Sequence, residues 1–122
     1  MEFRVTFYTD AQGNKPLLAF LDGLKQEQPA LEKLVAAGLG KLRDREYHHR
    51  PLTELVDPEH AIYELRVGGA NIARVFFFFA PGRQIVATNG YVKKGRKLDR
   101  SALQRAQTAK RDWERCHAQA AP

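Results

Sequence analysis

The chain has 122 residues, of which 43% are hydrophobic and 28% are charged, a composition ordinary for one globular domain with a core of its own. It holds a single cysteine, Cys116, which excludes an internal disulfide and a zinc site built from cysteines. No apolar run reaches the roughly 18 residues of a membrane helix, and the first residues alternate instead of forming a secretory apolar core. A cytosolic protein without a membrane segment is therefore expected.

The net charge of +6 is unevenly distributed along the chain. From Arg83 onward there are ten Lys and Arg against three Asp and Glu, an excess of +7, whereas residues 1–82 hold ten against eleven. All of the excess positive charge thus lies in the last third. Such a patch favours a polyanionic partner, either nucleic acid or an acidic protein, although a merely solvated basic helix has the same composition.

The first half of the chain predicts one strand followed by two helices. Residues 2–9 alternate apolar and polar side chains, which is the period of a half-buried strand. Apolar residues at i, i+3, i+4 and i+7 over 17–24 predict the inner face of a short helix. A second helix enters at Pro29, and its apolar positions continue to Leu42.

Three consecutive strands are then expected over about 61–67, 71–80 and 84–92, joined by turns that contain glycine. Four consecutive phenylalanines, Phe76–Phe79, must face both sides of the middle strand. A strand that is buried on both faces is most easily the centre of a sheet. The preceding segment 52–56 is extended as well, but it is not counted as a strand of this sheet.

The last helix begins after Asp99, a good N-cap residue, and the final residues of the chain are expected to fray. The order strand, helix, helix, three strands, helix describes an α+β domain. We expect a four-stranded antiparallel sheet with two helices on one face, and a last helix that crosses an edge or an end. No linker or repeat divides residues 1–122, so a single domain is predicted.

Two cations, Arg66 and Arg74, are set into the predicted strands, and two more, Lys93 and Lys94, directly follow the last of them. Alternate residues of a strand share a face, and a turn of odd length would place Arg74 opposite Glu64 on the face of Arg66. If the cations converge on an exposed concave side of the sheet, they can bind a phosphate and stabilise a pentacovalent transition state. Alternatively, Arg66 simply pairs with Glu64, and the lysines are a solvated turn.

His49, beside His48 in a polar connection, is a candidate general acid or base because histidine titrates near neutrality. An exposed loop histidine without a role is the alternative. The sequence has no HExxH, phosphate-loop, GxGxxG or GxSxG pattern, and its carboxylates lack the spacing of metal ligands. No metal and no cofactor are expected.

The segments YELRV, ARVFFFF and NGYVKKGRKLDRSALQRAQTAKRDW resemble the HigB-like, phage-derived Gp49-like branch of the RelE/ParE toxin superfamily. The shared features are an ELR motif, a strand with arginine before aromatics, a G-[FY]-x-K-K strand end and an AL-R pattern in the last helix. The element order agrees over about 3–115, and the motif similarity is confined to 62–113. The resemblance implies a RelE-like fold, a type II toxin and a small HigA/Xre-like helix-turn-helix antitoxin as its partner.

The activity that the resemblance implies is endonucleolytic cleavage of mRNA on the ribosome without a metal. In this chemistry the 2′-hydroxyl of the RNA attacks the adjacent phosphate in line, which leaves a cyclic phosphate and a 5′-hydroxyl. By the resemblance, Arg74 matches the phosphate-binding arginine, Arg66 the arginine of the ELR motif, and Lys93 and Lys94 the basic end of the last strand. Further RNA contacts are expected from Arg96, Lys97 and Arg100.

The residues that act as general acid and general base in this cleavage are not identified by the resemblance. RelE uses a tyrosine near the start of its last helix, and residues 98–103 contain none, so Tyr91, Glu64, His49 and Lys93 are all candidates. Other members of the superfamily, the ParE-like toxins, inhibit gyrase without cutting RNA. A gyrase inhibitor is therefore the alternative function, and a basic nucleic-acid-binding module is the third.

Overall fold

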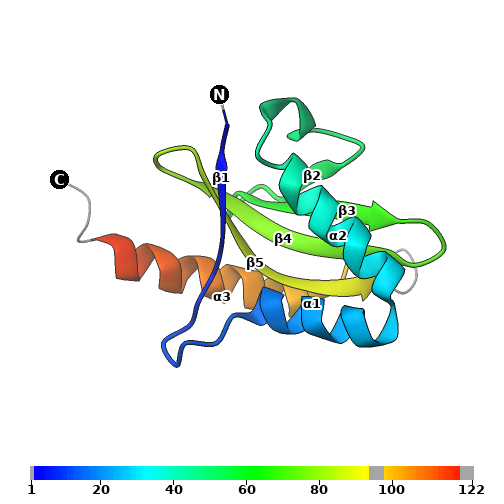
Figure 1. Ribbon diagram of the computed structural model, residues 1–122. Helices are drawn as coiled ribbons and strands as arrows, with labels where there is room; N and C mark the ends of the chain where they lie inside the picture. The colour runs from blue at the N-terminus through cyan, green and yellow to red at the C-terminus, as the bar shows by residue number, and fades with distance from the viewer. Residues whose placement is uncertain (1, 94–97, 119–122) are drawn as a thin grey trace.

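The computed structural model describes residues 2–93 and 98–118 and shows a mixed sheet with helices on both faces (Figure 1). The strands are β1 (Arg4–Phe7), β2 (Thr53–Asp57), β3 (Ile62–Gly68), β4 (Ile72–Ala80) and β5 (Gln84–Lys93). The helices are α1 (Pro16–Glu27), α2 (Pro29–Lys41), the short 3₁₀ helix η1 (Arg45–Tyr47) and α3 (Arg100–His117). The predicted α+β class is confirmed.

The sheet differs from the expectation in two respects. Its order is β1-β5-β4-β3-β2, with five strands where four were predicted, because the segment 53–57 pairs with β3. In addition, β1 runs parallel to β5, so the sheet is mixed and not wholly antiparallel. The meander β3–β5 leaves one edge of β5 open, and β1 covers that edge.

The central strand β4 separates two cores, as its four phenylalanines predict. Phe77 and Phe79 pack with α1 and α2, whereas Phe76 and Phe78 pack with α3. The last helix therefore lies on the sheet face opposite α1 and α2, where an edge or an end was predicted (Figure 1). Small residues allow this close approach, and they are Ala102, Ala106 and Ala109.

The start of α3 follows the prediction. The Asp99 side chain accepts a hydrogen bond of 3.0 Å from the Ala102 backbone N–H, which satisfies one free donor of the helix. Leu98 and Leu103 pack against the same core and fix the direction of the helix. The tail that was expected to fray, residues 117–122, begins at the last residue of α3, His117, and lies outside the described residues from position 119 onward. Within the described ranges, no helix is both long and apolar enough to cross a membrane.

Gly90 is required where α1 packs on β5. A Cβ at this position would lie 2.6 Å from Phe20 Cδ2 and 3.1 Å from the Arg74 carbonyl oxygen. We expect Gly90→Ala to lower the free energy of unfolding by about 1–3 kcal/mol in a urea titration. The control is Gly23→Ala in α1, because a Cβ at this position would meet no described atom within 4 Å outside the backbone of the helix. This substitution should raise the free energy of unfolding by about 0.5–1 kcal/mol. Two variants of equal stability would contradict this packing.

Candidate functional site

A buried ion pair lies at the centre of the candidate site. The side chain of Glu64 is fully buried, that of Arg74 is 8% exposed, and Arg74 Nη1 donates a hydrogen bond to Glu64 Oε1. A carboxylate in such surroundings requires a charged or hydrogen-bonded partner. The expectation that Arg74 lies on an exposed concave face is therefore wrong. Glu64 and Arg74 share the sheet face of Phe76, which packs with α3. Arg74 Nε finds no acceptor among the described residues.

The register of β3 and β4 explains how the pair forms. Arg66 lies opposite Arg74, and Glu64 lies opposite Phe76, so the predicted pairing of Arg74 with Glu64 is wrong by two residues. The chain turns over residues 69–71 after Gly68, whose φ of +123° suits glycine. All four positions still share one face, and Arg74 reaches Glu64 along the diagonal.

Arg66 connects the buried pair to the protein surface. Its Nε lies 3.6 Å from Glu64 Oε1, and its Nη1 donates to Glu54 Oε2 at 3.3 Å, with the side chain 31% exposed. The two carboxylates thus hold two arginines that would otherwise repel each other across the strands. Glu54 was not singled out from the sequence. Counting residues 52–56 as a strand would have revealed it, because Glu54 pairs with Glu64 in the ladder.

Strand β5 completes the cluster with Tyr91 and Lys93. Tyr91 lies opposite Arg74, and its hydroxyl donates to Glu64 Oε2 at 3.4 Å. Burial, followed by the negative charge of Glu64, raises the pKa of Tyr91, so it stays protonated at neutral pH. Burial, followed by the positive charge of Arg74, lowers the pKa of Lys93. A lysine that transfers a proton near neutral pH requires a shift in this direction.

A groove of about 510 Å³ opens beside the two arginines, beyond the last paired residues of β2 and β3. Three cations line it: Arg66, Arg74 and Lys41. Lys41 was missed by the sequence analysis, because it lies at the end of α2 and belongs to no motif. Several like charges at one groove attract an anionic ligand.

Two predicted residues within the described ranges, His49 and Arg100, do not join the cluster. His49 is exposed, and its Nδ1 lies 2.5 Å from the Arg50 carbonyl oxygen. Its neighbour His48 is structural, since its ring packs edge-on against Phe79 and its Nε2 lies 2.6 Å from the Leu42 carbonyl oxygen. Arg100 is exposed in the first turn of α3. Three more predicted residues lie outside the described ranges, namely Lys94, Arg96 and Lys97.

One group of possible metal ligands is present in the described residues. Asp57, Glu59 and His60 each offer a ligand atom, and these atoms lie within 4.8 Å of one another. However, Asp57 already accepts hydrogen bonds from His60 and from Gln107. The Lys110 ammonium, a fixed positive charge, donates to the His60 carbonyl oxygen. These contacts favour a structural group that ties the β2–β3 turn to α3.

The sequence profile of the phage-derived Gp49-like proteins matches residues 17–111, which is well over half of the chain. The chain belongs to this family. The Gp49-like proteins are the group of HigB-like, RelE-type toxins. The matched segment includes the whole Glu64 cluster and leaves out β1. A search of curated proteins finds no match.

Proposed function

We propose that this Gp49-like protein is the toxin of a type II toxin–antitoxin system and cleaves mRNA on the ribosome. The observation that carries the proposal is the groove lined by Arg66, Arg74 and Lys41, with Tyr91 and Lys93 beside it on β5. Family membership supports the toxin class, and the resemblance to RelE-type enzymes implies that no metal takes part. The same positive groove suits an acidic segment of a HigA/Xre-like antitoxin, which would bind in competition with RNA.

Each group of the cluster has a role in this chemistry. The scissile phosphate is bound by Arg66, the more exposed arginine, while Arg74 and Lys41 add positive charge. As the O2′–P bond forms and the P–O5′ bond breaks, negative charge grows on the phosphate oxygens, and cations already in place stabilise it. The 2′-hydroxyl proton passes to water, and protonated Lys93 donates a proton to the departing 5′-oxygen.

Glu64 and Tyr91 are poor candidates for the base. The Glu64 carboxylate is fully buried and is shared by Arg66, Arg74 and Tyr91. The raised pKa of Tyr91 keeps its hydroxyl protonated. Both residues are better suited to hold the arginines in place, and Glu64 is therefore assigned as a positioning residue.

The proposal is tested by induced expression in a bacterial host, followed by mapping of mRNA 5′ ends shortly after induction. We expect new ends within translated regions, and we expect a reporter mRNA without a start codon to stay intact. Growth arrest with uncut mRNA would reject the endonuclease assignment.

A non-enzymatic inhibitor, such as a gyrase inhibitor, is the second candidate. One observation favours it: the Arg74 guanidinium is bound by buried Glu64 and is not freely presented to a phosphate. This function predicts a DNA-damage response with intact mRNA, so the same induction experiment separates the two candidates.

The rate of RNA cleavage is expected to fall as the pH rises through the lowered pKa of Lys93. Only the protonated amine attracts the phosphate and donates a proton, and burial beside Arg74 makes the amine lose its proton at lower pH than an exposed lysine does. Lys93→Arg keeps the charge, so the fall should disappear while the neutral-pH rate drops about 100-fold. A wild-type rate that keeps increasing as the pH rises above neutral would contradict the role of Lys93 as the acid.

A further inference from the structure

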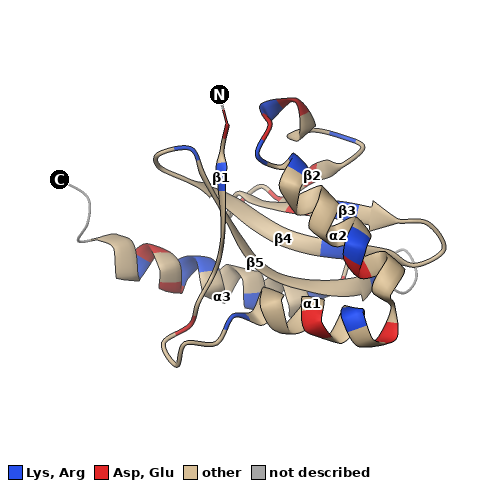
Figure 2. Cartoon of the chain, in the orientation of Figure 1, with Lys and Arg blue, Asp and Glu red and all other residues tan. Residues whose placement is uncertain are grey.

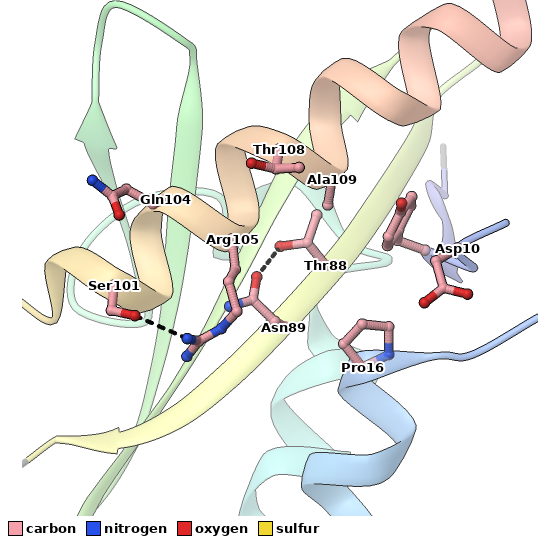
Figure 3. Close-up of a pocket in the computed structure, with 10 residues that line it drawn as sticks. Asp10, Pro16, Thr88, Asn89, Ser101, Gln104, Arg105, Thr108 and Ala109 are labelled. Carbon is pink, nitrogen blue, oxygen red and sulfur yellow. Dashed lines mark hydrogen bonds between the residues drawn. The ribbon is translucent and has the colours of Figure 1, made fainter. Parts of the chain in front are cut away.

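A second pocket, of about 360 Å³, lies between α3, β5 and the loop after β1 (Figure 3). Thr88 and Asn89 of β5 form its floor, Arg105 extends over them from α3, and Asp10 lies on the opposite wall (Figure 3). The volume is at the lower end of the roughly 300–1,000 Å³ of small-molecule sites. It suits a ligand the size of one nucleoside.

The floor of this pocket is produced by a β-bulge. Val75 pairs with Gly90 and Phe77 with Ala87, so Thr88 and Asn89 together face the single residue Phe76. The bulge aims both polar side chains toward α3, where they are almost completely buried. Thr88 Oγ1 donates to Asn89 Oδ1 at 2.8 Å, and Asn89 Nδ2 donates to the Ala102 carbonyl oxygen at 3.0 Å. A carboxamide has two donors and two lone pairs, so each end of Asn89 can bind one more group.

The two walls carry opposite charges. The Arg105 guanidinium has five N–H donors and donates to Ser101 Oγ at 3.0 Å, which leaves several donors to reach a ligand. Across the pocket, Asp10 Oδ1 accepts backbone hydrogen bonds from Gln12 and Asn14, which hold its carboxylate in place. The lining also includes the apolar surface of Pro16. A ligand that matches this pocket has an anionic group, a flat partly apolar body and a hydrogen-bond donor at the other end.

We propose that this pocket binds one unpaired nucleotide of the RNA, with the phosphate on Arg105 and the base over Asn89. The oxygen atoms of Asp10 and Asn89 can accept hydrogen bonds from an exocyclic amino group of the base. Bases that have such a group, such as adenine and cytosine, therefore bind better than uracil. Lys and Arg outnumber Asp and Glu along α3, and this excess of positive charge guides the RNA to the pocket (Figure 2).

The pocket and the cationic groove can be occupied by one RNA strand. Asn89 and Tyr91 are alternate residues of β5 on the face that α3 covers, about 7 Å apart. The first turn of α3 lies between them, since Ala102 contacts Asn89 and packs near Tyr91. A strand of RNA that occupies both sites must therefore pass around the start of α3. The inference rests on the proposed cleavage of RNA and adds a nucleotide preference at a fixed distance from the cut.

The test is a titration of the ¹⁵N-labelled full chain with adenosine, cytidine and uridine 5′-monophosphate, followed by NMR. We expect saturable shifts of the Asn89 side-chain amide, with the adenosine or cytidine nucleotide about three- to tenfold tighter than the uridine nucleotide. Arg105→Gln should weaken binding at least about tenfold. The control Arg83→Gln removes the same charge from the exposed β4–β5 turn and should leave binding unchanged.

Several results would overturn the assignment: no shifts at Asn89, inorganic phosphate binding as tightly as the nucleotides, or an acidic peptide displacing them at equal concentration. The last result would assign the pocket to an acidic protein segment.

A wrong assignment of the pocket can be distinguished from a wrong proposed function. If the wild-type protein cleaves mRNA and Arg105→Gln cuts with an unchanged nucleotide preference, the pocket assignment is wrong. If nucleotides bind at Asn89 but the wild-type protein leaves mRNA uncut, the assignment of the pocket is correct and the proposed function is wrong.

Discussion

Replacing Glu64 with alanine is expected to lower the free energy of unfolding by about 3–5 kcal/mol. The substitution leaves the Arg74 guanidinium buried without its carboxylate partner, because Arg74 is only 8% exposed and pairs with the fully buried Glu64. It also removes the acceptor of the Tyr91 hydroxyl and one of the two carboxylates beside Arg66. Urea unfolding, followed by the fluorescence of Trp113, measures the loss.

Two further variants separate the effect of charge from that of volume. Glu64→Gln keeps the size and one acceptor oxygen, so it should be less destabilising than Glu64→Ala. The double variant Glu64→Leu with Arg74→Met removes both charges and should recover most of the loss, because well-packed apolar residues often replace a buried ion pair without cost. The coupling between the two positions follows from a double-mutant cycle. A loss below about 1 kcal/mol in Glu64→Ala would show that Arg74 does not depend on this carboxylate.

This dependence determines which arginine is suitable for functional tests. Arg74→Ala removes the nearest cation of a fully buried carboxylate, which among the described residues keeps only Arg66 at 3.6 Å and the Tyr91 hydroxyl at 3.4 Å, so a loss of toxicity in that variant would report on folding as much as on catalysis. Arg66 retains a partly exposed side chain, and Glu64 keeps Arg74 as its partner when Arg66 is removed. Arg66 is therefore the better probe of the groove.

The features that could be predicted from the sequence are those encoded locally. The central position of β4 follows from Phe76–Phe79, which must be buried on both faces. The start of α3 follows from Asp99, whose side chain bonds to a backbone amide three residues later. The grouping of Glu64 with Arg66 follows from the alternation of a strand. Each of these requires only neighbouring residues.

The features that could not be predicted depend on contacts distant in the sequence. The parallel pairing of β1 with β5 joins Arg4 to Gln84, and no pattern within either strand specifies its partner. The face that α3 covers is decided by how its alanines fit against β4 and β5, and Arg74 lies buried on that face. The arrival of Lys41 at the groove depends on the packing of α2. A sequence motif identified Arg74, but only the tertiary structure shows that its charge is already bound by Glu64.

Replacing Arg66 with alanine is expected to lower the rate of RNA cleavage by about 100- to 1,000-fold while the protein stays folded. Arg66 is the arginine of the cluster with the more exposed guanidinium, and it contributes charge at the groove where the phosphate is proposed to bind. Its ion pair with Glu54 is only partly buried, so its loss should cost about 1 kcal/mol or less of stability. Growth after induction and single-turnover cleavage on translating ribosomes measure the effect, and urea unfolding checks the fold.

Two variants serve as controls for Arg66→Ala. Arg66→Lys keeps the charge but loses bidentate contact with phosphate, and it should recover only part of the rate. Arg43→Ala removes another surface arginine, which does not line the groove and whose Nη2 lies 2.9 Å from Glu2 Oε2. This variant should cleave RNA as the wild type does. If Arg66→Ala cleaves within about threefold of Arg43→Ala, the phosphate does not bind at this groove. The family assignment would then be unaffected, and the search for the active residues would move to the pocket over Asn89, where Arg105 provides the next cation aimed at a concave surface.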